Sequence, residues 1–116
     1  MKRCMMIIFA IILFSGTAWA QPAIGSGAFT SSKVIVAVPV NLVDAGCQTD
    51  GTADVTMLVY DNASAASGKV LAFVFVPAGF KTGGWNCPVE SGASSGLYAS
   101  VSGTGVTRCL VSFKTK

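Results

Sequence analysis

Beyond residue 32, apolar residues either alternate with polar ones or form short apolar runs, and Gly, Ser, Asn, Asp and Pro separate these stretches. Alternation with a period of two residues is typical of a β-strand with one buried face, because successive side chains point to opposite sides of a sheet. No stretch of this region repeats its apolar residues at the 3.6-residue spacing of an amphipathic helix. The pattern therefore predicts an all-β domain.

Six strands are predicted, at residues 33–43, 53–60, 69–76, 80–87, 96–102 and 106–114. Pro39 places the first at an edge or forces a bend in it, and residues 44–52, with two Gly and two Asp, are predicted to form a turn or loop. Residues 69–76 are apolar on both faces, which predicts a central strand covered on both sides. The last two strands form a hairpin through Gly103-Thr104-Gly105. The set predicts a small antiparallel β-sandwich or jelly-roll-like domain at 33–116, after an irregular lead-in at 21–32.

The first twenty residues have a different character. Met1-Lys2-Arg3 is positively charged, residues 5–14 are apolar, and Ala18-Trp19-Ala20 supplies small residues at the right spacing for cleavage. This order is typical of a secretory signal peptide, predicted to be removed after Ala20 together with Cys4. The apolar run is too short to cross a bilayer, which needs about 20 residues. We therefore expect export to the periplasm, cell surface or medium, with no membrane span after signal cleavage.

Little charge remains once the signal is removed. Six basic residues (Lys33, Lys69, Lys81, Arg108, Lys114 and Lys116) face five acidic ones (Asp44, Asp50, Asp54, Asp61 and Glu90). This near-balance argues against nucleic acid as a partner. A surface rich in Ser, Thr, Gly and Ala suits packing against neighbours, so protein partners or self-association are expected.

Three cysteines remain in the mature part, Cys47, Cys87 and Cys109. An exported chain meets an oxidising compartment in which a disulfide persists. The three possible bridges have loop-closure terms of about 3 to 4.5 kcal/mol, too similar to choose between them. Because Cys109 alternates with Val111 and Phe113 while Cys47 and Cys87 flank turn residues, the pattern favours Cys47 with Cys87 and leaves Cys109 buried. The alternatives are Cys109 as a bridging partner, a bond to another chain, and three buried thiols.

No catalytic, cofactor or metal site is predicted. Gly92-Ala93-Ser94-Ser95-Gly96 matches G-x-S-x-G, but the chain has no His to activate Ser94, and a Ser–Lys arrangement with Lys81 would need a desolvated amine. A turn is the better interpretation. Four aspartates, at positions 44, 50, 54 and 61, fit no calcium-loop spacing. Without His or C-x-x-C, zinc is not expected.

Two surface features each have two interpretations. Asn62-Ala63-Ser64 fits a glycosylation acceptor or a simple turn. Trp85 is the candidate surface-binding aromatic, with Phe80, Tyr60 and Tyr98 beside it, although large aromatics in a small β-domain also serve as core. Such a cluster would bind a glycan or a protein partner.

Four stretches share a layout of strand, YDN-type turn, strand, GLY-type strand and G-x-G hairpin: VTMLVYDNAS (55–64), SGKVLA (67–72), CPV (87–89) and GLYASVSGTG (96–105). In this layout the chain resembles small all-β structural proteins of tailed bacteriophages, associated with the virion surface or head. The resemblance implies a structural protein without an active site. The export signal and the cysteines depart from that family and favour a phage- or prophage-encoded protein of the periplasm or cell surface.

The leading hypothesis is therefore an exported, non-enzymatic structural or surface-interaction protein that self-associates or binds a protein partner. The alternative is a secreted binding protein for a glycan or cell-surface receptor, such as a blocker of phage adsorption. A small hydrolase using Ser94 is the remote alternative.

Overall fold

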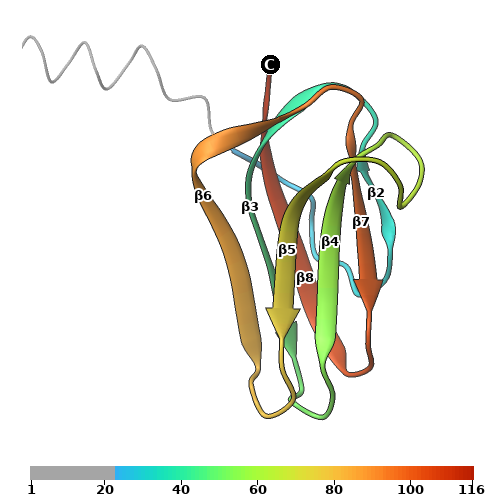
Figure 1. Ribbon diagram of the computed structural model, residues 1–116. Helices are drawn as coiled ribbons and strands as arrows, with labels where there is room; N and C mark the ends of the chain where they lie inside the picture. The colour runs from blue at the N-terminus through green and yellow to red at the C-terminus, as the bar shows by residue number, and fades with distance from the viewer. Residues whose placement is uncertain (1–22) are drawn as a thin grey trace, which may run out of the picture.

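The computed structural model describes residues 23–116, and for residues 86–90 it describes the backbone only; the predicted signal peptide lies outside the described residues. This part of the chain forms eight β-strands (Figure 1): β1 (Ile24–Gly25), β2 (Lys33–Val36), β3 (Val40–Thr49), β4 (Val55–Asp61), β5 (Val70–Val76), β6 (Thr82–Ala93), β7 (Leu97–Ser102) and β8 (Val106–Thr115). Within residues 23–116 there is no helix of the length and apolar character needed to cross a membrane.

The strands form two four-stranded antiparallel sheets, β1-β8-β3-β6 and β2-β7-β4-β5. In Figure 1 the second sheet lies in front of the first. Successive strands alternate between the two sheets except for β4 and β5, which pair within one sheet, and this order is that of the eight-stranded jelly roll. The predicted all-β sandwich is confirmed, with two strands more than the sequence pattern indicated.

The core lies between the sheets and is built from alternate residues of each strand. On β4, Val55, Met57 and Val59 are fully buried, and on β3 Val40 and Leu42 are fully buried as well. Removing an apolar side chain of this size from water contributes about 1.5–3 kcal/mol. The alternation seen in the sequence thus becomes the inner and outer faces of two packed sheets.

The first predicted strand, 33–43, is two strands in the structure. The chain bends at residues 37–39, which include Pro39, so β2 joins one sheet and β3 the other. Residues 44–49, predicted as a loop, continue β3 between β6 and β8. Gly46 lies opposite Gly84 on one side and Leu110 on the other. Pairing on both sides of β3 overrides the turn preference of Asp and Gly, because strand propensity depends on sheet context.

The lead-in at 21–32 is also not wholly irregular. Ile24 pairs with Phe113 on β8, and Phe29 exchanges two backbone hydrogen bonds with Cys109. The Phe29 side chain is buried in the core, and Ser26 Oγ accepts a hydrogen bond from the Val111 amide at 3.0 Å. These contacts satisfy backbone groups along the outer edge of β8, so the sandwich begins before residue 33.

Candidate functional site: the uncharged outer face of one sheet

The disulfide joins Cys47 to Cys109, with Cα atoms 4.1 Å apart. The two residues lie directly opposite each other on β3 and β8. Because the amide and carbonyl of Cys109 bond to Phe29 on the other side, the cysteines form a non-hydrogen-bonded pair, the closer of the two antiparallel pair types. The predicted pairing of Cys47 with Cys87 was therefore wrong. It assumed that Cys47 flanked a turn, whereas Cys47 lies within a strand.

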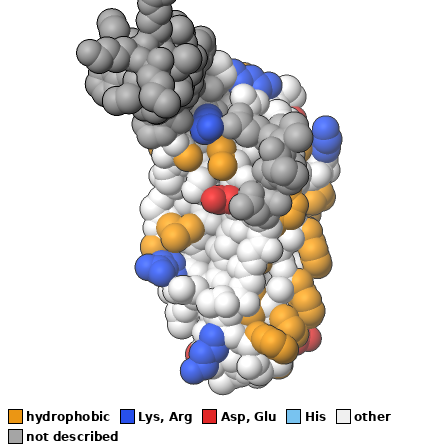
Figure 2. Space-filling model, turned by 90° about the vertical axis from the view of Figure 1, so that its left-hand side faces the viewer, with side chains coloured by type: hydrophobic (Ala, Val, Ile, Leu, Met, Phe, Trp, Pro, Cys, Tyr) orange, Lys and Arg blue, Asp and Glu red, His pale blue; other side chains and the backbone are white. Residues whose placement is uncertain are grey.

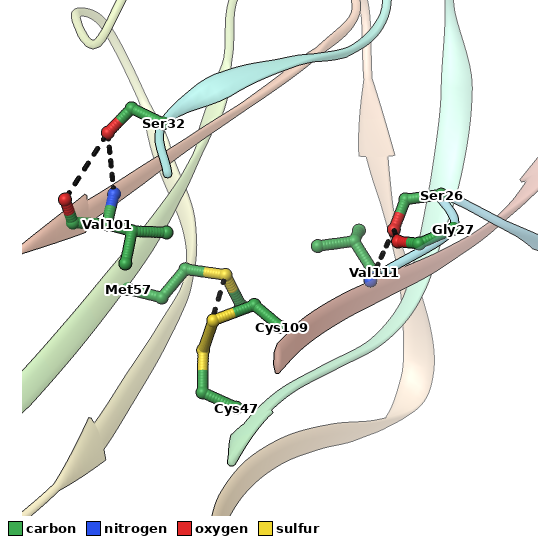
Figure 3. The surroundings of a disulfide bond; sticks show 8 residues. All are labelled: Ser26, Gly27, Ser32, Cys47, Met57, Val101, Cys109 and Val111. Atoms are coloured by element: carbon green, nitrogen blue, oxygen red, sulfur yellow. Dashed lines mark hydrogen bonds between the residues drawn. A yellow bond between two sulfur atoms is a disulfide. The ribbon is translucent and has the colours of Figure 1, made fainter. Parts of the chain in front are cut away.

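This bridge is a structural element facing the core. Cys47 and Cys109 are 3% and 0% exposed, and Cys47 Sγ lies 3.8 Å from Met57 Sδ on the opposite sheet (Figure 3). Burial between the sheets removes the sulfurs from solution partners. The bridge links β3 to β8 through two cysteines that are 62 residues apart in the sequence.

The G-x-S-x-G stretch forms the turn between β6 and β7. Asp61 accepts hydrogen bonds from the Ser94 amide and hydroxyl at 3.0 and 2.9 Å, and from the Ser95 amide at 2.9 Å. Lys81 precedes β6 and Ser94 follows it, so the strand separates the two residues of the hypothetical Ser–Lys pair. The described residues contain no group of three or more metal-ligating side chains.

Hydrogen bonds from the backbone amides of Ser94 and Ser95 hold the pKa of Asp61 below its ordinary value of 3.8. A lowered pKa in the folded state stabilises the fold above the unfolded pKa, and this contribution is lost as the pH falls through the folded pKa. For Asp61→Asn, we therefore expect the loss of stability to be largest near neutral pH and to shrink below about pH 4. Urea unfolding of both proteins between neutral pH and pH 2 measures this difference; a pH-independent difference would contradict it.

Asn62 and Ser64 also belong to a turn. Asn62 Oδ1 accepts hydrogen bonds from the amides of Ser64 and Ala65 at 2.9 and 3.0 Å, and its Nδ2 donates to Ser67. The side-chain amide is therefore engaged in the connection between β4 and β5. The turn interpretation accounts for every polar atom of this side chain.

Trp85 is half-buried on β6 and packs against the core. It lies opposite Ala45, a buried residue of β3, so it belongs to the inner side of its sheet. The candidate surface-binding aromatic is thus mainly a packing residue at the sandwich margin. Of the other three aromatics, Phe80 is 63% exposed, whereas Tyr60 and Tyr98 are half-buried.

The large exposed aromatics of β5 were not predicted. Phe73 and Phe75 are 55% and 46% exposed, and their rings are nearly parallel, at 12°, with centroids 6.4 Å apart. The prediction of a central strand covered on both sides was wrong, because β5 is the edge strand of its sheet. Ala72, Val74 and Val76 point into the core, and no described element covers the opposite side.

Strand pairing extends this apolar strip over the whole sheet. Phe73 lies opposite Leu58 on β4, and Tyr60 lies between Val70 on β5 and Tyr98 on β7. We call the outward-pointing strand residues of this sheet the uncharged face: Val34, Thr56, Leu58, Tyr60, Val70, Leu71, Phe73, Phe75, Tyr98, Ser100 and Ser102. No residue of this set is ionisable near neutral pH.

The outer face of the other sheet has a different composition. Asp44, Gln48, Arg108 and Lys114 point outward there, and on β3 and β8 they surround one exposed apolar residue, Leu110. Figure 2 looks at the β6 side of the molecule; hydrophobic side chains run down its right-hand margin, where the β2-β7-β4-β5 sheet lies, and the charged side chains on this margin lie near its two ends. Among the residues whose side chains the structure describes, four of the eight exposed large hydrophobic residues lie on the uncharged face: Val34, Val70, Phe73 and Phe75.

No family model, curated protein or solved structure matches this chain. We therefore infer its function from its own residues. The uncharged face offers hydroxyl and aromatic groups and carries no side chain that is charged near neutral pH. Contiguous exposed apolar patches of this kind mark interaction sites on soluble proteins.

The sequence carried one signal for this face. Within residues 70–76, Ala72, Val74 and Val76 alternate with the larger Leu71, Phe73 and Phe75. Both sets are apolar, so periodicity alone cannot say which one is covered. In a jelly roll the fifth strand is an edge strand, and only that topology shows that one set faces water.

Proposed function

We propose that this protein is an exported, non-enzymatic structural or surface-interaction module, phage- or prophage-related, that works by docking its uncharged face on another protein. The observation that carries the proposal is the exposure of Phe73 and Phe75 on the edge strand of a face without charges. Isolated exposed apolar residues are common, but a contiguous set that spans a sheet is not.

The form of the face favours a protein partner. A four-stranded sheet gives a broad surface rather than a cleft, and small-molecule sites are concave. Aromatic residues are enriched and charged residues depleted at the centre of protein interfaces. The alternation of Phe73 with buried Val74 presents the ring outward without loosening the core.

The proposed location rests on two independent features, and the biological setting on a third. The first twenty residues have the order of a signal peptide. The buried bridge between Cys47 and Cys109 is of a kind that persists in oxidising compartments. The resemblance to small all-β phage proteins suggests the biological setting, since jelly rolls serve as capsid and lectin domains.

Fractionation of bacteria that express the full chain tests this function. We expect the protein in the periplasm, at the surface or in released particles, with the mass of a chain cleaved after Ala20 that contains a disulfide. Phe73→Asp should release it from surface or particle fractions into the soluble pool, because a buried unpaired carboxylate opposes docking. Leu110→Asp, on the other outer face, is the matched control and should remain bound. Cytosolic protein that retains Met1 would contradict the proposal.

A second candidate, binding to a glycan, is favoured by a shallow depression on the polar outer face. It has a volume of about 500 Å³, and the residues of this face that line it are Leu110, Asp44, Gly46, Gly84 and Ser112. An apolar wall beside a carboxylate and a hydroxyl suits a sugar ring. The same experiment distinguishes the two candidates: release by Leu110→Asp but not by Phe73→Asp would indicate the depression.

A further inference from the structure

We infer that the uncharged face binds a second copy of this chain, with the two faces packed against each other across a two-fold axis. The inference rests on the proposed function in one respect, that this face is a protein contact. It adds the identity of the partner and the mode of packing.

The charge distribution favours a copy of the same chain. In a two-fold dimer each residue near the axis meets itself or a near neighbour, so any charge there would face a like charge. Phe73, Leu58 and Ser100 form one row across the sheet, and Tyr60 with Tyr98 forms another. Neither row contains a charge that would repel the same row of a second copy. Neither row contains a charge that would select an oppositely charged partner.

The extent of the face agrees with the core of a dimer interface. With about half of each ring exposed, Phe73 and Phe75 together present roughly 150–250 Å² of aromatic surface. Val34 and Val70 are 38% and 46% exposed and enlarge this area, with further contributions from half-buried residues of the face. The total is of the order of 300–600 Å², the size of the largest patch on a typical monomer. A standard interface buries about 800 Å² per partner, of which roughly 60% is apolar.

Packing of the faces accounts for the exposed rings better than pairing of the β5 edges does. Edge pairing would satisfy backbone groups but leave Phe73 and Phe75 directed into water. Moreover, β6 already occupies part of that edge: a Cβ added at Gly83 would lie 2.9 Å from the Phe75 carbonyl oxygen. Two sheets packed face to face interdigitate their side chains and bury the rings.

A lipid surface is the other occupant to consider, and the shape of the apolar set argues against it. Phe73 and Phe75 lie along the middle of a strand rather than at the tip of a loop, so a bilayer would have to cover a whole sheet. The face also lacks the Lys and Arg residues with which peripheral proteins attract anionic lipids. Binding to anionic vesicles is therefore an outcome that would overturn the inference.

Sedimentation of the purified mature protein over about a hundred-fold range of concentration tests the dimer. We expect a monomer–dimer equilibrium for the wild type. Phe73→Asp should weaken it by at least about 30-fold, the effect of removing a buried aromatic anchor from an interface. Leu110→Asp, a substitution of a similarly exposed apolar residue on the other sheet, should leave it unchanged. A wild type that is monomeric at every concentration would overturn the inference.

A second variant tests whether Phe73→Asp loses the dimer only because it fails to fold. Ser100→Lys adds a charge to the row of Phe73 and Leu58 without removing an apolar contact, and two such lysines would face each other near the axis. We expect the same loss of dimer with an unchanged circular-dichroism spectrum. A dimer that tolerates Ser100→Lys and Phe73→Asp would place the contact elsewhere and overturn the inference.

The two proposals can fail separately. A monomeric protein that still leaves surface or particle fractions upon Phe73→Asp would overturn the dimer and leave the docking function in place. A dimer that Phe73→Asp dissociates, found only in the cytosol with Met1 retained, would overturn the exported function and leave the dimer in place.

Discussion

Replacing both Cys47 and Cys109 with alanine is expected to lower the free energy of unfolding by about 4 kcal/mol. The bridge closes a loop over a sequence separation of 62 residues, and cross-linking a loop of this length removes a large part of the chain entropy of the unfolded state. Small domains have a total stability of only about 5–15 kcal/mol. Guanidinium unfolding of the double variant and of the wild type measures the difference.

Cys87→Ser is the matched control for this experiment. The structure pairs Cys47 with Cys109, so this variant should retain the mass of one intact disulfide under non-reducing conditions. Under native conditions the buried wild-type bridge should also resist a thiol reductant, because attack requires the sandwich to open. A variant that loses its disulfide together with Cys87 would show that the pairing is wrong.

Leu42→Ala is expected to lower the free energy of unfolding by about 3 kcal/mol, and Leu110→Ala by less than about 1 kcal/mol. Both are leucines of the same sheet, but Leu42 is 0% exposed between the sheets whereas Leu110 is 41% exposed on the outer face. Truncating a buried leucine loses the transfer free energy of the removed atoms and leaves a cavity, and neither loss is large at the surface. Denaturant unfolding of the two variants side by side provides the measurement.

Equal losses for the two leucines would contradict the assignment of inner and outer faces on β3 and β8. That assignment also underlies the choice of Leu110 as the control position in the experiments on the uncharged face. The leucine pair should therefore be measured first.

These expectations separate the residues that maintain the fold from those proposed to act. Leu42, Met57 and the disulfide lie between the sheets, and their substitution should change stability. Phe73 and Ser100 lie on an outer face, where substitution should change association and leave folding intact. Because inward-pointing and outward-pointing residues alternate along the strands, stability and association can be changed and measured separately.

Much of the fold was predictable because local patterns carry it. The alternation in 53–60 and 106–114 predicted β4 and β8 closely. The predicted hairpin through Gly103-Thr104-Gly105 was wrong, because this turn joins β7 in one sheet to β8 in the other, and the two strands do not pair. The errors occurred where a local preference competed with sheet pairing. Residues 44–49 contain turn-forming Asp and Gly but lie between two partner strands. Residues 24–29 resemble a flexible lead-in but complete the edge of β8.

The amino-acid sequence by itself determined the all-β class, the positions of most strands and the inward alternation of the valines. Only the tertiary structure decided that Cys47 faces Cys109 and that Phe73 and Phe75 lie on an open face. The physical reason is the range of the interactions. A strand repeats every two residues and is visible locally, whereas the neighbour of a strand, and whether anything covers its second face, depends on segments dozens of residues away.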